Sequence, residues 1–527
     1  MKSFAREALA QIPKILTLQD RNAHSPTYGC FDRNFWHYKI IDFPSGMAAE
    51  FVWPLSLAYS QPIEGNGFYQ QAAIKEWVEA GILYAARSAH GDGSCDDYFP
   101  FEKAAGAAAF SLLACMESYQ LLGLDNEEML AFFRLRADWL ADHHESGRLT
   151  NHQALIVLCL EKAGRIFATP RWDSLKAARL QRVFDWQNEE GWFQEYEGCD
   201  PGYHTLTVGI LAQLYALTPS APLKAALQRA VTFASEFVHP DGSFGGEYTS
   251  RNTYNFFPHG FEIAGQWIPE ATAINDRFLA GLDAGLGSCY ADDHIIGHHT
   301  WSYLLAAEHF RSERPAALPM SEGRKHFKNA GIIIERRGSS VLYLALNKGG
   351  VFKFFSEGKL VHSDTQFSAM VSAGKLRNAV AHLVGQYQVE LEADSVTIRG
   401  DLGWAKTKGM TTFNLVVLRA LMLSVGRFFP DLIRKLLQKL LITGKSPAPL
   451  AFCRTLAWQG ARLEVRDELR SSAWDKVRAV GIGALQTSIY VVMSRTYQAG
   501  QLQPWLDLTD KVRALKNGEA LKLERRF

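Results

Sequence analysis

Two different hydrophobic periodicities divide this 527-residue chain. Between about residues 70 and 310, apolar residues recur every three or four positions in segment after segment, the spacing that buries one face of a helix. From about residue 328, the apolar segments are short, rich in β-branched residues and separated by Gly, Asp and Ser, which is typical of antiparallel strands. The sequence therefore predicts a helical half followed by a β half, separated by the Pro- and charge-rich segment 311–328.

The loops between the predicted helices resemble one another. Segments His90–Ser94 and His239–Ser243 share the pattern His-x-Asp-Gly-Ser. Their turn glycines are Gly93 and Gly242, and a third such loop contains Gly191. Gly93 and Gly191 are 98 residues apart, and Gly191 and Gly242 are 51 residues apart. These separations are close to two units and one unit of a repeated helical hairpin. Asp and Gly also favour isolated tight turns, so the alternative to a repeat is that these loops are simple turns. If the hairpins close into a ring, these loops meet at one mouth.

Composition excludes several classes of protein. The chain has 56 basic and 55 acidic residues, a net charge of +1, so we expect no nucleic-acid partner. Seven cysteines without a Cys-x-x-Cys pair favour neither a disulfide framework nor a cysteine zinc site. Because neither a secretory leader nor a long apolar run is evident, we expect a cytoplasmic protein.

Segment 411–445 interrupts the β half with apolar residues at helical spacing. Its charged residues are Asp431 and the basic set Arg419, Arg427, Arg434, Lys435, Lys439 and Lys445. A basic amphipathic helix can lie on an anionic membrane, which would give the protein a peripheral contact with the inner face of the membrane. The alternative, slightly favoured because arginines interrupt the apolar run, is a helical hairpin packed on its own sheet with its basic face in water.

Three short polar segments are the strongest candidates for chemistry. Asn151 and His152 begin one predicted helix, and Tyr203 begins another 52 residues later. One hairpin returns the chain to the neighbouring inner helix, so these side chains are expected at the mouth of the ring. His362 and Asp364 lie at the end of a predicted strand in the β half.

In their order and placement, these segments resemble the heparinase II/III-like, or alginate-lyase-like, polysaccharide lyases. Asn151 and His152 match the family's Asn-His pair, Tyr203 matches its catalytic Tyr, and His362 lies in the matching β-domain segment. The chain departs from the family pattern at Thr150, where another Asn or a small residue is usual, and at Leu360, where a further His is usual.

The resemblance implies an α+β multidomain fold with an N-terminal (α/α) toroid followed by a C-terminal antiparallel β-sandwich. Residues 71–320 would form the toroid and residues 1–70 would pack on it. Residues 328–527 would form the sandwich, with 411–445 as an insertion.

The chemistry that the resemblance implies is β-elimination on a uronate-containing polysaccharide, without a cofactor. Asn151 and His152 would bind the uronate carboxyl and stabilise the charge that develops when the C5 proton leaves. We assign His362 as the base and Tyr203 as the acid, and the reverse assignment stays open.

Other residues support other hypotheses. A glycoside hydrolase needs two carboxylates, and Glu195 and Glu247 are candidates in the repeated loops, although acids there also stabilise helix N-termini. A third class is a non-catalytic glycan-binding protein of polysaccharide biosynthesis. Further candidates for substrate binding are Arg251, as a carboxylate clamp or an ion-pair partner, and Trp192, Tyr248 and His259.

We expect no metal site. The candidate ligands would be Asp292, Asp293, His294, His298 and His299. His294 and His298 have helical i, i+4 spacing, but Gly297 is expected to interrupt a helix there.

Overall fold

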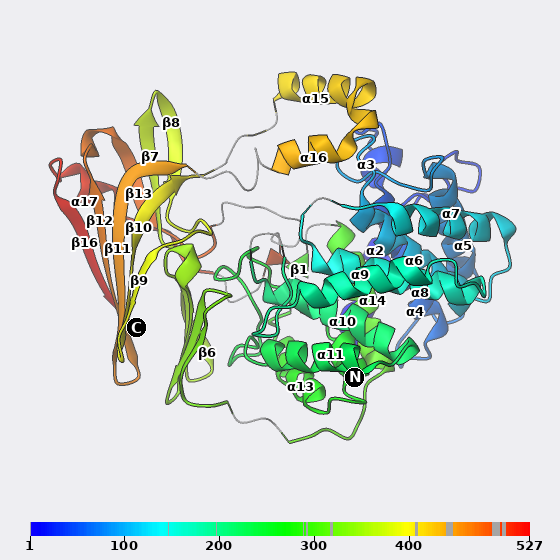
Figure 1. Cartoon of the computed structure of the whole chain (residues 1–527), viewed down its shortest axis with the longest axis horizontal. Helices are drawn as coiled ribbons and strands as arrows, with labels where there is room; N and C mark the ends of the chain where they lie inside the picture. The colour runs from blue at the N-terminus through cyan, green and yellow to red at the C-terminus, as the bar shows by residue number, and fades with distance from the viewer. Residues whose placement is uncertain are drawn as a thin grey trace.

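The computed structural model describes residues 2–145, 147–195, 198–287, 289–290, 293–316, 320–405, 409, 411–438, 446–486, 496–497 and 502–527. A helical lobe holds the first part of the chain and two layers of β-strands hold the last part (Figure 1). The predicted (α/α) toroid followed by an antiparallel β-sandwich is confirmed. Within the predicted β half, most of the apolar segment 487–498, which is also expected to form a strand, lies outside the described residues.

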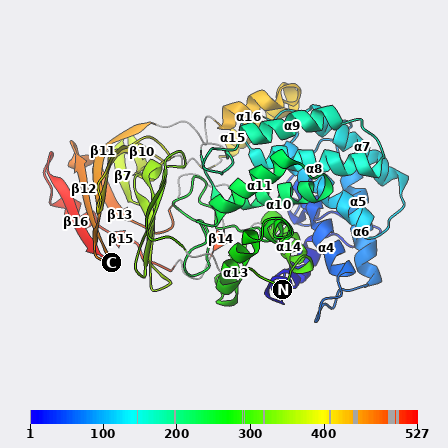
Figure 2. The same cartoon turned by 60° about the horizontal axis from the view of Figure 1, so that its bottom comes forward.

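Six inner helices form a closed ring, because each contacts the next and α14 contacts α4. They are α4 (Val52–Ser60), α6 (Ala105–Leu121), α8 (Thr150–Ile166), α10 (Pro201–Leu217), α12 (His259–Ala264) and α14 (Asp293–Glu308). Outside them lie α1 (Lys2–Leu9), α5 (Ala72–Ser88), α7 (Glu127–Asp142), α9 (Asp173–Asp185), α11 (Ala221–Ala234) and α13 (Glu270–Asp283), and Figure 2 shows the helical lobe from a second side. α2 (Ile12–Leu18) and α3 (Arg33–Trp36) also precede α4. Because α4 is one of the inner helices, the ring begins before residue 71.

Three loops that lead from an outer to an inner helix have the same backbone geometry. The amides of His90, Asn188 and His239 each donate to the carbonyl four residues ahead, at 2.9, 2.7 and 2.9 Å. The turn glycines Gly93, Gly191 and Gly242 have φ of +87°, +103° and +83°. In each case a Cβ would lie within 2.8 Å of the backbone of an outer helix, which explains why glycine recurs. The predicted repeat is therefore present in the structure.

Two antiparallel sheets form the β half. The five-stranded sheet contains β2 (Gly323–Phe327), β3 (Ile332–Arg337), β4 (Ser340–Ala345), β5 (Val351–Ser356) and β6 (Lys359–Asp364). The nine-stranded sheet contains β7 (Phe367–Ala373), β8 (Lys375–Val380), β9 (Gln388–Leu391), β10 (Ser395–Trp404), β11 (Pro447–Gln459), β12 (Arg462–Ser471), β13 (Val477–Ile482), β15 (Leu506–Asp507) and β16 (Ala520–Arg526). A separate short pair joins β1 (Cys289–Tyr290) to β14 (Thr496–Tyr497), and α17 (Thr509–Arg513) follows β15.

The five-stranded sheet is buried on both faces. Tyr343 and Phe355 belong to the hydrophobic core of the toroid, whereas Leu342, Phe352 and Phe354 belong to the core between the two sheets. This sheet therefore lies between the toroid and the nine-stranded sheet, and it fixes the β half against the mouth of the ring (Figure 1).

A charged network lies in the core of the sandwich. The Arg454 guanidinium donates to Asp364 Oδ1 at 2.8 Å and, through Nε, to Asp467 Oδ1 at 2.6 Å. Arg525 Nη2 lies 2.7 Å from both carboxylates. Burial alone would raise the pKa of Asp364, but Arg454 and Arg525 outweigh it and hold this pKa well below its usual range. Asp364 therefore stabilises the sandwich.

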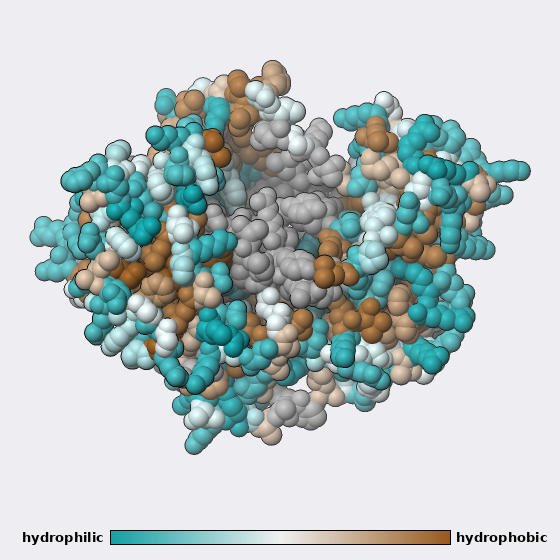
Figure 3. Space-filling model, turned by 180° about the vertical axis from the view of Figure 1, so that it is seen from behind, coloured by the Kyte–Doolittle hydropathy of each residue, from teal (hydrophilic) through white to brown (hydrophobic). Residues whose placement is uncertain are grey.

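The insertion folds as a helical hairpin, α15 (Thr412–Ser424) and α16 (Pro430–Gln438), and residues 439–445 lie outside the described residues. The expectation that the hairpin packs on its own sheet is wrong, because the hairpin lies against the toroid (Figures 1 and 2). Arg419 pairs with Asp42 at 2.9 Å. The expectation of a basic face in water is wrong for Arg434, which is buried, while apolar side chains face outward (Figure 3).

No helix in the described ranges is both long enough and apolar enough to cross a bilayer.

Asp364→Asn should lower the free energy of unfolding by about 3–5 kcal/mol, because it leaves a buried guanidinium without its full counter-charge. The folded state lowers the Asp364 pKa, so this contribution is present above its ordinary value of 3.8 and is lost as the pH falls. Urea unfolding of parent and variant at several pH values measures both effects. Asp394→Ala, at an aspartate whose side chain is 72% exposed, is the control and should change stability by less than about 1 kcal/mol. Equal stability of Asp364→Asn and parent near neutral pH would contradict the assignment.

Candidate active site

One buried carboxylate fastens the start of α10 to a loop from the next repeat. Asp200 is the N-cap of α10 and accepts from the Tyr203 amide at 3.0 Å. It also accepts from Thr249 Oγ1 at 3.0 Å, from the Arg251 amide at 3.2 Å and from Thr253 Oγ1. An aspartate is favoured at an N-cap for its own helix, and here it also holds the loop that carries Arg251. Tyr203 and Arg251 are thereby brought together.

Arg251 connects Tyr203 to Asn151. Its guanidinium carbon lies 3.9 Å from the centroid of the Tyr203 ring. Its Nη1 lies 3.6 Å from Glu195 Oε2. Glu195 Oε1 in turn accepts from the Asn151 backbone amide at 3.0 Å and from Asn151 Nδ2 at 2.8 Å. Side chains from two neighbouring inner helices and two loops therefore form one continuous array at the mouth of the ring.

Glu195 has an unusual electrostatic environment. Complete burial raises its pKa to about 7, against the opposing effects of Arg251 and of the hydrogen bonds from Asn151. Asn151 is also fully buried, and its Oδ1 has no hydrogen-bond partner among the described residues. The Asn151–Glu195 pair is thus buried more deeply than Arg251.

His152 is oriented by a second chain of charges. Its Nδ1 lies 2.6 Å from Glu145 Oε2, and Glu145 Oε1 accepts from Arg434 Nη1 at 2.6 Å. Arg434 Nη2 reaches Glu102 Oε1 at 3.2 Å. Burial would raise the pKa of Glu145, but His152 and Arg434 lower it to about 2, so this carboxylate stays ionised. The His152 side chain is 20% exposed, which leaves it accessible to a substrate.

Glu145 and Arg434 were not expected to take part in the site. Glu145 lies in the loop just before the Asn-His pair, and Arg434 is a basic residue within the amphipathic insertion. Nothing in the sequence pairs these two positions, which are 289 residues apart. Asp200, directly before Pro201, is one of the loop acids expected to stabilise a helix N-terminus, and it does cap α10.

The β half holds the loop that carries Arg251. Lys348 Nζ donates to the carbonyl oxygens of Glu247 at 2.6 Å and Thr249 at 2.9 Å, and to Asn252 Oδ1 at 2.5 Å. Burial lowers the pKa of Lys348 to about 7. One lysine therefore connects the five-stranded sheet to the site.

The structure does not bring His362 to Tyr203. The half-buried His362 ring stacks on Phe527, with centroids 4.4 Å apart, and Phe527 packs against the core between the sheets. Its neighbour Ser363 faces the toroid, where its Oγ lies 3.3 Å from Glu247 Oε2. The β5–β6 register shifts between Leu360, which packs on the toroid core, and His362. Since side chains alternate along a strand, this bulge turns His362 to the opposite face, a position that does not favour His362 as the base.

Glu247 and Tyr248 hold the two halves together. Glu247 Oε2 lies 3.1 Å from Lys353 Nζ, and the glutamate is 2% exposed. The Tyr248 hydroxyl lies 2.9 Å from His239 Nε2 and is buried beside Tyr343. These contacts give both residues a structural role in the interface between toroid and sheet.

Trp192 and His259 are buried as well. Trp192 Nε1 donates to Glu190 Oε2 at 2.9 Å, so its indole is part of a loop core. His259 lies within the ring with Nδ1 2.8 Å from Ser302 Oγ, and burial lowers its pKa to about 3. Neither ring is placed as an open surface for sugar stacking.

His298 and His299 of α14 each lie against one polar side chain rather than within a cluster of metal ligands. His298 Nδ1 lies 2.5 Å from Glu50 Oε1, and His299 Nε2 lies 3.0 Å from Asn255 Oδ1. The expected interruption at Gly297 is wrong: α14 continues through it, and a Cβ there would lie 3.2 Å from Phe51. The described residues contain no group of three metal-binding side chains; the side chain of His294 is outside them.

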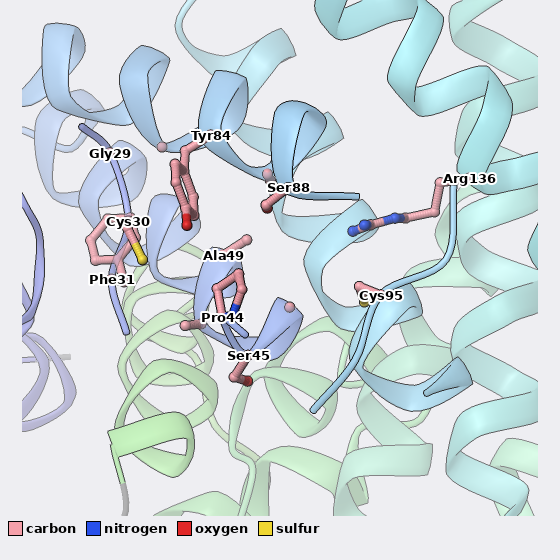
Figure 4. Close-up of a pocket in the computed structure, with 14 residues that line it drawn as sticks. Gly29, Cys30, Phe31, Pro44, Ser45, Ala49, Tyr84, Ser88, Cys95 and Arg136 are labelled. Atoms are coloured by element: carbon pink, nitrogen blue, oxygen red, sulfur yellow. The ribbon is translucent and has the colours of Figure 1, made fainter. Parts of the chain in front are cut away.

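A small cavity lies elsewhere, between the N-terminal segment and α5 (Figure 4). Cys30, Ser45, Tyr84 and Arg136 are among its lining residues, and its volume is about 20 Å³. That is room for one water molecule rather than for a sugar.

The fold is similar to that of solved carbohydrate-active enzymes. A chondroitin AC lyase from Streptomyces coelicolor, in complex with chondroitin sulphate, has 12% identity and a TM-score of 0.55 over 91% of this chain and 67% of that chain. A heparan sulfate lyase from Pedobacter heparinus has 12% identity and a TM-score of 0.39 over 91% and 70% of the two chains. A cellobiose 2-epimerase from Bacillus thermoamylovorans has 12% identity and a TM-score of 0.46 over 59% and 100%.

By sequence, no known family model and no curated protein matches the chain. The structural likeness to the chondroitin AC lyase confirms, for the fold, the resemblance seen in the sequence.

Glu195→Gln should make stability less dependent on pH. Because the folded state raises the Glu195 pKa from 4.5 to about 7, its contribution is complete below about pH 4.5 and is lost as the pH rises through 7. The parent should lose up to about 3 kcal/mol more stability than the variant between pH 5 and pH 9. Urea unfolding across this range measures the difference. Parallel pH profiles of parent and variant would show that Glu195 titrates normally.

Proposed function

We propose that this protein cleaves a uronate-containing polysaccharide by β-elimination, with Tyr203 as the group that transfers the proton. The fold shared with a chondroitin AC lyase makes carbohydrate chemistry at the mouth of the toroid a reasonable premise. The assignment of residues rests on the contacts of this chain.

The Arg251 guanidinium over the Tyr203 ring, 3.9 Å from its centroid, is the observation that carries the proposal. A phenol is an inefficient base near neutral pH because its ordinary pKa is about 10. Burial by itself disfavours a phenolate, and a fixed cation beside the ring offsets that cost because their attraction is stronger away from water. Both side chains are about 9% exposed, so they are largely shielded from water but are not completely buried.

The uronate carboxyl needs partners that strengthen as charge develops on it. We assign His152, oriented by Glu145, and Arg251 to this role, because donors fixed before the reaction cost no reorganisation during it. Asn151 binds Glu195 in this structure, so it acts behind Arg251 as a positioning residue. This changes the role expected for Asn151, which was direct contact with the carboxyl.

The Tyr203 phenolate takes the C5 proton, and the C5–H electron pair forms the C4–C5 double bond. The C4–O bond breaks with its electrons on the leaving glycosidic oxygen. That oxygen takes a proton from the Tyr203 hydroxyl, which regenerates the phenolate. The products are a new chain end with a free hydroxyl and an unsaturated uronate.

The two other hypotheses have less support from the contacts. Glu195 and Glu247 are 0% and 2% exposed, and each is held by a cation, which does not suit the paired, substrate-facing carboxylates of a hydrolase. A non-catalytic glycan-binding protein would not need the Arg251–Tyr203 pair. The first experiment below separates all three.

Tyr203→Phe should lower turnover at least about a thousandfold, because it removes the group that takes and returns the proton. The assay follows the rise in ultraviolet absorbance of the unsaturated product over a panel of uronate-containing polysaccharides. His362→Gln is the matched control and should retain turnover within about threefold, since His362 lies between the sheets. Loss of activity in His362→Gln with retention in Tyr203→Phe would reverse the assignment. Cleavage without an absorbance rise would indicate hydrolysis, and binding without cleavage would indicate a glycan-binding protein.

Arg251→Lys and Arg251→Met separate charge from shape. Arg251→Met should lower turnover at least about a hundredfold, because it removes the cation beside the Tyr203 ring. Arg251→Lys should recover part of that loss, since the charge is kept while the planar contact is lost. Turnover and circular dichroism are measured on both proteins. Equal turnover of Arg251→Met and parent, with both folded, would exclude a role for the cation.

A further inference from the structure

We propose that the hairpin α15–α16, together with the segment 38–40 after α3, docks this protein on an anionic lipid membrane surface. This inference goes beyond the proposed activity, because it concerns a face away from the reacting residues. It depends on the exposure, anchoring and charge of the described part of the insertion.

The face exposes many large apolar side chains. On the hairpin, the side chains that are at least 50% exposed are Phe413 (76%), Phe428 (66%), Leu432 (63%), Val416 (59%), Val425 (57%), Phe429 (56%), Leu423 (55%) and Leu436 (50%). Ile40 (71%) and Tyr38 (55%) lie on the adjoining segment. Seen from behind, hydrophobic side chains gather at the top of the molecule, where the hairpin lies (Figure 3). A contiguous apolar area of this kind marks an interaction site.

The hairpin is anchored, so this exposure belongs to an ordered surface. Arg434 and Ile433 face the toroid at 7% and 9% exposure, and Arg434 pairs with Glu102 and Glu145. Arg419 pairs with Asp42 and lies over the Phe43 ring, with its guanidinium carbon 5.2 Å from the centroid. These contacts orient α16 with its polar anchor inward and Leu432 and Leu436 outward.

The charge of the face matches an anionic surface. Lys39, Arg427 and Lys435 are exposed among the apolar side chains. Asp431 is the acid of these segments and is half-buried, and the neighbouring Asp42 is paired with Arg419. Aromatic and aliphatic side chains flanked by cations are typical of helices that lie in the interface of an anionic bilayer. α15 and α16 have 13 and 9 residues, too short to cross a bilayer of about 30 Å, so they would lie along it.

Other occupants suit the face less well. A second copy of the chain, related by a twofold axis, would bring the same cations together. A uronate polysaccharide would match the cations but would leave the apolar side chains without a partner. A lipid surface satisfies both the apolar and the cationic groups.

Vesicle flotation with the full chain tests the proposal. The protein should float with vesicles of phosphatidylcholine and phosphatidylglycerol, and at least about tenfold less with phosphatidylcholine alone or in high salt. The triple variant Phe413→Ser/Phe428→Ser/Leu432→Ser and the double variant Arg427→Glu/Lys435→Glu should each lower flotation at least about tenfold. Leu376→Ser/Leu502→Ser is the matched control, because these leucines are 56% and 79% exposed on the β half.

Circular dichroism and turnover on a soluble polysaccharide should be unchanged in the hairpin variants, because none of the replaced residues contacts the reacting groups. These readouts separate a failure of membrane docking from a failure of the proposed activity. Absence of flotation with anionic vesicles, or equal flotation of parent and variants, would overturn the proposal. A dimer in analytical ultracentrifugation that the triple variant dissociates would also overturn it and assign the face to a second copy.

Discussion

Arg251 is the residue on which the arrangement of the site depends. Its guanidinium lies over the Tyr203 ring on one side and opposite Glu195 on the other, and Glu195 holds Asn151. Its backbone amide is bound to Asp200, which also caps the helix that presents Tyr203. A buried cation of this kind is tolerated only with such partners, so the same contacts that stabilise the loop also define the chemistry that the site can perform.

Local patterns predicted most of the fold and one part of the site. Helical periodicity and the recurring turn glycines predicted the ring, because those turns need a positive φ and close contact with a helix backbone. Asn151 and Tyr203 were predicted correctly at the starts of helices, and α8 and α10 are neighbours in the ring. Their direct connection through Arg251 and Glu195 depends on a loop from a third repeat, which spacing alone did not specify.

The remaining differences come from contacts that a local pattern does not contain. A one-residue register shift between Leu360 and His362 turns the imidazole away from the toroid. The residue types in that strand do not predict this bulge. Arg434 meets Glu145 across 289 residues, and this contact requires the insertion to leave its own sheet. The site is therefore built from both halves of the chain, with Lys348 and Arg434 as the contributions of the β half.

Every role assigned to Tyr203, His152 and Arg251 requires that cleavage begins with removal of the C5 proton of a uronate. The most direct measurement uses a uronate oligosaccharide deuterated at C5 and cleaved in water enriched in heavy oxygen. Elimination should give a primary isotope effect on kcat/KM, an unsaturated uronate in one product, and no heavy oxygen in the new reducing end. Heavy oxygen at that anomeric carbon, with no isotope effect, would show hydrolysis and exclude elimination.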